Sequence, residues 1–203
     1  MEKLGKKDLL KNILLISFLA IISFFISIIL FYTLLDNILL WQFEGFLINI
    51  SLRILLAVAI FQVLWGIIKK KIPRVFIWIL GILYTAVLLG TVLFKSPDVR
   101  SVNLNPLTLL SDFSFIPFYV IANFLCFVPL GMFVRYIIPN VNRSFLLVGG
   151  FLLSLLFEIV QYIFKLGVSD VNDIIMNGLG FAFGVWIMLL LRENKKIKEI
   201  LNM

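Results

Sequence analysis

Long apolar runs, separated by short polar or charged connections, extend along almost the whole chain. The apolar runs cover approximately residues 12–32, 46–68, 75–94, 119–138, 145–164 and 173–191. Each is close to the ~20 residues that an α-helix needs to cross the hydrocarbon core of a bilayer. The pattern therefore predicts an all-α integral membrane protein, built as a bundle of six transmembrane helices.

Positive charges are concentrated at alternate connections. The basic clusters lie at residues 3–11, 69–74, 135–143 and 192–198. The other connections hold Lys95, Arg100 and Lys165. Since Lys and Arg are enriched in cytoplasmic loops, this asymmetry predicts that both termini are cytoplasmic. It also accounts for the net charge of +7 without a nucleic-acid partner, so we expect a multi-pass protein of the cell membrane.

Composition agrees with this class and removes several kinds of chemistry. Hydrophobic residues make up 62% of the chain and charged residues 14%, whereas a soluble domain is about one-quarter charged. The chain has no histidine, which excludes His-ligated metal sites and Ser–His or Cys–His nucleophile pairs. The single cysteine, Cys126, lies in an apolar run, and we interpret it as a small buried hydrophobe.

Four blocks of polar residues interrupt the apolar sequence in its second half. They are RSVNLNP (100–106), NFLCFVPLG (123–131), SLLFEIVQ (154–161) and SDVNDIIMNGLG (169–180). Asn, Gln, Asp and Glu are unfavourable within a bilayer, which offers them no water, so by default they indicate a functional site. On the predicted topology all four blocks lie at external helix ends. We therefore predict an outward-facing polar site in the outer half of the membrane.

Residues of the last two runs recur at helical spacing. Polar side chains four and three residues apart share one helix face, and two such sets are present. The sets are Ser154, Glu158 and Gln161, and Asp170, Asp173 and Asn177. Gly180 and Gly184 form a small-xxx-small pair that lets another helix approach closely. Both the polar and the small faces are therefore predicted to point into the bundle.

The connection 95–118 is unusually apolar for a free loop. Three prolines punctuate it, and its middle section, 104–110, is largely apolar. We predict an interfacial or re-entrant segment that lies over the polar site. The stretch 38–46, which contains Trp41, is predicted to be a second interfacial piece.

The four blocks, in this order, resemble the VanZ-like family of bacterial membrane proteins. The matching residues are Arg100, Asn103 and Pro106; Asn123, Pro129 and Gly131; Ser154, Glu158 and Gln161; and Asp170, Asp173, Asn177 and Gly180. The resemblance covers roughly residues 80–190. It divides the chain into an N-terminal two-helix extension (1–74), a VanZ-like membrane core (75–192) and a cytoplasmic tail (193–203). The family often has an Arg shortly before the aspartates, where this chain has Leu166, Gly167 and Val168.

The resemblance implies a bacterial membrane protein that gives resistance to glycopeptide antibiotics, chiefly the lipid-bearing teicoplanin type. We expect it to bind or remodel a lipid-linked component of the cell envelope among the membrane lipids. Arginines and oriented amides can hold a phosphate or sugar headgroup. The expected ligand-binding residues are Arg53, Arg100, Asn103, Asn123, Gln161, Asp170 and Asn177.

A membrane enzyme is the alternative hypothesis, with Glu158 and Asp173 as the candidate catalytic residues. Glu158, Asp170 and Asp173 can supply oxygen ligands for Mg²⁺. Equally, a buried Glu158 can act as a general acid or base in acyl, glycosyl or phosphoryl transfer. A lipid flippase or transporter is a further alternative. The sequence identifies no cofactor, no metal ligand set beyond this and no oligomeric state, so enzyme and binding hypotheses both stay open.

Several of these polar residues also have structural explanations. The amides alone are as readily explained by hydrogen bonds that hold the bundle together. Asp170 is expected to cap the last helix. Arg53 lies inside the second run, where it either reaches to the interface or pairs with Glu158 or Asp173.

Overall fold

Six long helices dominate the computed structural model, which describes residues 6–31, 46–93 and 99–201. They are α1 (Lys6–Leu30), α2 (Phe46–Lys69), α3 (Arg74–Leu93), α5 (Pro117–Ile137), α6 (Arg143–Phe164) and α7 (Val171–Glu193). Each is long and apolar enough to cross a membrane. The six predicted runs are thus confirmed as helices. The interfacial piece expected around Trp41 lies outside the described residues, apart from its last position.

The expectation of an all-α chain missed two short strands. Strand β1 (Val99–Asn103) pairs in parallel with β2 (Leu166–Asp170), and Val99 is opposite Leu166 in the register. Two shorter helices are also present, α4 (Thr108–Phe115) and α8 (Lys195–Ile200). A parallel pair is specified by a partner far along the chain, so a search for apolar runs of helical length does not detect it.

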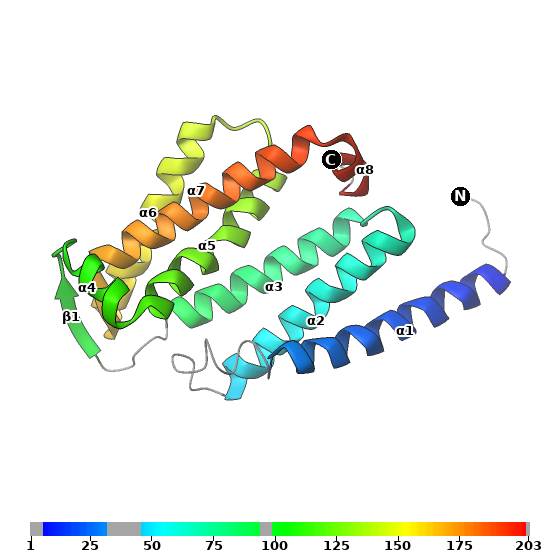
Figure 1. Cartoon of the computed structure of the whole chain (residues 1–203), viewed down its shortest axis with the longest axis horizontal. Coiled ribbons are helices and arrows are strands. Elements are labelled where there is room, and N and C mark those ends of the chain that lie inside the picture. Colours follow the sequence, from blue (N-terminus) through cyan, green and yellow to red (C-terminus); the bar gives the residue numbers. More distant parts are fainter. Residues whose placement is uncertain (1–5, 32–45, 94–98, 202–203) are drawn as a thin grey trace.

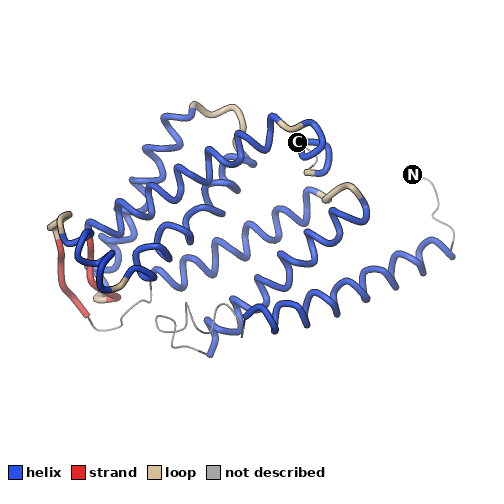
Figure 2. Tube along the Cα trace, viewed as in Figure 1, coloured by secondary structure: helices blue, strands red, loops and turns tan. Residues whose placement is uncertain are grey.

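The helices form two groups that lie side by side (Figure 1). Helices α1, α2 and α3 follow one another in a layer, and α3 contacts α5 and α6 of the second group. Helices α5, α6 and α7 form that second group, with α7 packed on both α5 and α6. The two strands and α4 lie at one end of the molecule, and α8 lies at the other (Figures 1 and 2).

Glycines make the α5–α7 contact unusually close. A methyl group added at Gly180 would overlap the main-chain oxygen of Phe124, and one at Gly184 would overlap that of Val128. Gly131 of α5 approaches the main chain of Phe181 in the same way. The close approach predicted from the small-xxx-small pair is confirmed. It fixes the relative position of the two helices that carry Asn123 and Asp173.

Apolar side chains also cover much of the outer surface of the helices. Ile67 of α2 is 68% exposed and Phe145 of α6 is 75% exposed. A soluble protein would expose such a continuous apolar surface only at a cost in free energy. The distribution therefore agrees with a protein whose surroundings are lipid.

Candidate functional site

The predicted polar residues of the second half gather at the α4 end of the second helix group. We call this set the polar cluster; its members are Asn103, Thr108, Asp112, Tyr119, Asn123, Ser154, Glu158, Gln161, Ser169, Asp170, Asn172, Asp173 and Asn177. Helix α5 begins at this end, α6 ends there and α7 begins there. The β1–β2 pair and α4 bring the preceding connection to the same place (Figure 1).

Asp173 is the most deeply enclosed acid of α7. It is 4% exposed, and each of its carboxylate oxygens accepts a hydrogen bond from α5. Tyr119 Oη donates to Oδ2 at 2.9 Å, and Asn123 Nδ2 donates to Oδ1 at 2.5 Å. Because a buried carboxylate is costly unless its oxygens accept hydrogen bonds, these two donors make this position of Asp173 possible.

Asp170 joins the start of α7 to the end of β1. Its Oδ1 accepts from the main-chain N of Asn172 at 2.8 Å, which is the predicted N-cap. Its Oδ2 accepts from Asn103 Nδ2 at 3.0 Å. The same amide donates to Thr108 Oγ1 at 2.9 Å. Asp170 is therefore both a cap and a link between two segments that are 67 residues apart.

Helix α4 is held over the cluster by Asn172. Its Nδ2 donates to Thr108 Oγ1 at 2.7 Å and to Asp112 Oδ2 at 3.1 Å. Leu110 is two residues from both Thr108 and Asp112, which places it on the opposite side of the helix, and it is apolar and 72% exposed. The segment thus has one polar side on the cluster and one apolar, exposed side, and its interfacial position stays a prediction.

Glu158 holds strand β2 against the end of α6. Its Oε2 accepts from the main-chain N of Asp170 at 2.9 Å, and its main-chain oxygen accepts from Ser169 Oγ at 2.5 Å. Glu158 itself is 4% exposed. Both interactions tie the turn between α6 and α7 to one helix position, so Glu158 contributes directly to the shape of the cluster.

Two buried amides have acceptor oxygens whose hydrogen-bonding capacity is not met within the described chain. Asn177 Nδ2 donates to Ser154 Oγ at 3.1 Å, but Asn177 Oδ1 has no donor there. Asn172 Oδ1 is in the same state. Gln161 is also buried, one turn beyond Glu158 on α6. A buried acceptor without a donor is rare in native proteins and calls for an explanation.

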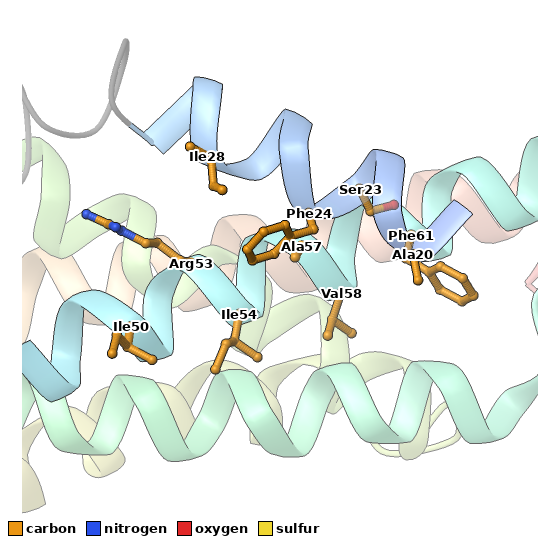
Figure 3. A pocket seen from close by; sticks show the side chains of 10 residues that line it. All are labelled: Ala20, Ser23, Phe24, Ile28, Ile50, Arg53, Ile54, Ala57, Val58 and Phe61. Carbon is orange, nitrogen blue, oxygen red and sulfur yellow. The ribbon is translucent and has the colours of Figure 1, made fainter. Parts of the chain in front are cut away.

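The two arginines expected at the site lie apart from its buried part. Arg100 is exposed on β1, with its guanidinium 4.3 Å from the centre of the Tyr162 ring. Arg53 was expected either to reach to the interface or to pair with Glu158 or Asp173. It lies between α1 and α2 beside Ile28 (Figure 3), with its guanidinium 4.4 Å from the centre of the Phe31 ring. Helix α2 packs on α1 and α3, which places Arg53 outside the polar cluster.

The three carboxylates proposed for Mg²⁺ each face donors from the protein. Glu158 and Asp170 accept main-chain hydrogen bonds, and Asp173 accepts from Tyr119 and Asn123. Across the described ranges, no group of three His, Cys, Asp or Glu side chains is placed to hold a metal ion. The arrangement as it stands is a hydrogen-bonded network.

Several members of the cluster were not predicted from the sequence. Thr108, Asp112, Tyr119 and Asn172 all bond to residues that were predicted. Asp112 and Asn172 carry a signal in retrospect, because both are strongly polar residues in apolar surroundings. Tyr119 carries none, since tyrosine at a helix start is also typical of a membrane interface.

Comparison with known proteins places the second half of the chain in a family. The VanZ/LLP1 family model matches residues 76–192, which is more than half of the chain. The chain is also similar to Protein VanZ of Enterococcus faecium, with 29% identity over 127 residues, covering 58% of this chain and 76% of the relative. No solved structure matches it significantly. The match contains α3, α5, α6, α7 and the polar cluster, and the chain therefore belongs to the VanZ/LLP1 family.

Proposed function

We propose that the polar cluster faces the outside of a bacterial membrane and binds the headgroup of a lipid-linked component of the cell envelope. Binding or remodelling of that component protects the cell against lipid-bearing glycopeptides of the teicoplanin type. Family membership and the similarity to Protein VanZ support this proposal. The positive-inside distribution of Lys and Arg supports the outward direction.

The enclosed Asp173 is the observation that carries the proposal. A carboxylate within a membrane helix is costly, and here two side chains of another helix are committed to it. Packing alone could be met by apolar residues at lower cost. An acid that is held this firmly is instead suited to present a fixed acceptor to a ligand.

The hydrogen-bonding character of the cluster favours a sugar-bearing headgroup. Asn172 Oδ1 and Asn177 Oδ1 lack donors in the described chain, and sugar hydroxyls supply donors. Arg100 lies at the exposed edge of the same end and suits a phosphate. The proposed ligand therefore places its sugar toward the acceptors of α7 and its phosphate toward β1, with the hydrocarbon tail in the bilayer.

Drug susceptibility in a sensitive Gram-positive host tests the proposal. The wild-type chain is expected to raise the inhibitory concentration of teicoplanin and to leave that of vancomycin unchanged. Asp173→Asn is expected to abolish this protection, because the amide nitrogen cannot accept from Asn123 or Tyr119. Glu193→Gln is the matched control, since it removes one exposed carboxylate from the opposite end of α7.

Membrane levels are measured for every variant, so that loss of protein is separated from loss of function. Full protection by Asp173→Asn at wild-type membrane levels would contradict a role for the cluster. Equal protection against both drugs would contradict the link to the antibiotic's own lipid.

A further inference from the structure

A groove separates the two helix groups and is distinct from the polar cluster. It has a volume of about 560 Å³ and is lined by α2, α3, α5 and α7, together with Leu201, the residue that follows α8. On α2 the lining residues include Leu52, Ala59 and Val63, which are spaced along one face of the helix. Helix α3 contributes Leu80 and Tyr84. We call this feature the central groove.

The polar side chains along the central groove are already bonded to the protein. Gln62 Nε2 donates to the main-chain oxygen of Phe76, and Tyr84 Oη donates to that of Cys126. The remaining lining is predominantly Leu, Ile, Val, Phe and Met. A cavity with this lining does not hold ordered water well, and the surrounding medium of the protein is lipid. Hydrocarbon is therefore the matching occupant.

Two arginines lie at the α8 end of the groove. Arg192 follows the lining residue Leu191, and Arg135 precedes the lining residue Tyr136. Arg192 Nη2 donates to the main-chain oxygen of Tyr136 at 3.1 Å, and Arg135 Nη1 donates to that of Val141 at 2.7 Å. The two guanidinium groups are near enough to repel each other.

Neither arginine has a carboxylate partner within the described ranges. Their bonds go to main-chain oxygens, and the Nε atoms of both are buried without an acceptor. Glu193 and Glu199 lie at this end, but they form no ion pair with Arg135 or Arg192. Two neighbouring cations without an anion are unfavourable in a partly buried position, so the pair suits an anionic group from outside the chain.

Helix α8 closes this end of the groove. The main-chain N of Ile72 donates to the oxygen of Ile200 at 2.6 Å, and Tyr136 Oη donates to that of Leu201 at 3.2 Å. These bonds connect the α2–α3 turn, α5 and the last helix. An occupant is thus enclosed by elements of both helix groups, and the arginine pair lies beside the closure.

We propose that the central groove binds an anionic phospholipid, with its phosphate at Arg135 and Arg192 and one acyl chain between α2, α3 and α5. Basic pockets between membrane helices are a recognised setting for anionic headgroups. A helix from a second copy of the chain would fill the apolar part but would leave the arginine pair without an anion. The site is independent of the polar cluster and of antibiotic protection.

Lipid binding to the purified chain, measured by native mass spectrometry, tests the proposal. Phosphatidylglycerol and phosphatidylcholine with identical acyl chains are compared. We expect tighter binding of phosphatidylglycerol, and Arg192→Gln is expected to weaken it about tenfold, since a hydrogen bond to a charged group is lost. Arg192→Lys keeps the charge and is expected to retain most of the preference.

Three further measurements separate the parts of the site. Arg143→Gln removes an exposed arginine from the start of α6 and is expected to change nothing. Ala59→Phe fills the groove and is expected to weaken both lipids. Glycerol phosphate, which has no acyl chain, is expected not to compete.

Equal binding of the two lipids by the wild-type chain would overturn the proposal. An unchanged preference in Arg192→Gln and in Arg135→Gln would overturn it as well. Competition by glycerol phosphate would show that the site binds a simple anion and not a lipid. Dimers formed in place of lipid complexes would show that the groove binds a second copy of the chain. None of these results affects the outcome of the drug-susceptibility test, so the two proposals can fail separately.

Discussion

Individual polar groups of the cluster differ in how fully they are satisfied. Thr108 Oγ1 accepts from Asn103 and Asn172 and donates to the main-chain oxygen of Asn105, which uses its whole capacity. Asn177, by contrast, is 3% exposed and its Oδ1 meets no donor among the residues that the structure describes. A buried acceptor of this kind calls for an explanation, and a functional role is one of those that native structures provide. The two kinds of residue should therefore respond differently to substitution.

Replacing both members of the Ser154–Asn177 pair tests this difference. Ser154→Ala with Asn177→Leu removes a hydrogen bond of 3.1 Å and a buried acceptor together. Because both partners become apolar, the free energy of unfolding is expected to stay within about 1 kcal/mol of the wild type or to rise. Protection against teicoplanin is expected to be lost. Thermal unfolding in detergent and drug susceptibility measure the two effects.

Asn123→Leu provides the contrast, because it removes only one partner of Asp173. It is expected to destabilise the chain by about 1–3 kcal/mol, since a buried carboxylate oxygen loses its donor. If the double variant unfolds more easily than Asn123→Leu, the Ser154–Asn177 pair is a structural contact.

At the scale of elements, the contact between α5 and α7 sets the geometry of the site. Gly131, Gly180 and Gly184 allow the two main chains to touch, and the bonds from α5 to Asp173 lie farther along the same contact. A shift of one helix by more than about 1 Å would take Asn123 out of hydrogen-bond distance of Asp173. Precision at the site therefore depends on residues that have no polar group.

A pair of glycine variants tests the α5–α7 contact. Gly184→Ala is expected to destabilise the chain by about 1–3 kcal/mol, because the new methyl group meets the main chain of Val128. Gly149→Ala is the matched control on α6, where nothing lies within 4 Å of the added methyl group. It is expected to leave stability unchanged or to raise it by up to about 1 kcal/mol. Equal unfolding temperatures for the two variants would contradict the close contact.

The elements that could be predicted are those whose signal is local. Six helices follow from runs of apolar residues, and the shared faces of Ser154, Glu158 and Gln161 follow from their spacing. The pairing of strand β1 and the position of α4 depend on hydrogen bonds to residues more than 60 positions away in the sequence. The bond from Asn172 to Thr108 and the placement of Arg53 against Phe31 do not follow from any helical or strand repeat in the sequence. The sequence alone therefore does not predict them.

The whole molecule consists of a family core and two helices that precede the matched region. The VanZ/LLP1 match begins in α3, whereas α1 packs on α2 and α2 packs on α3. The polar cluster gathers where α7 begins, whereas Arg135 and Arg192 lie in the last turns of α5 and α7, at the opposite end of the second helix group. If the chain spans a membrane as the basic residues predict, the two ends face different compartments.

Single-cysteine labelling of intact cells tests this orientation. With Cys126 replaced by Ala, Ser111→Cys marks α4 and Lys196→Cys marks α8, and both positions are exposed. A membrane-impermeant maleimide is expected to label Ser111→Cys on intact cells and Lys196→Cys only after lysis. The reverse pattern would place the polar cluster on the cytoplasmic side.

Because β1 pairs with β2, which is synthesised much later, the polar cluster can assemble only late in the synthesis of the chain. Asn123 leaves the ribosome 50 residues before its partner Asp173, an interval of about 3–10 s at a synthesis rate of ~5–20 residues per second. During that time α5 enters the membrane before the Asn123 amide has its hydrogen-bond partner Asp173. Strand β1 is likewise complete before β2 has been synthesised. The cluster can close only when α7 arrives. Biogenesis factors that shelter polar helices during this interval would therefore act on α5.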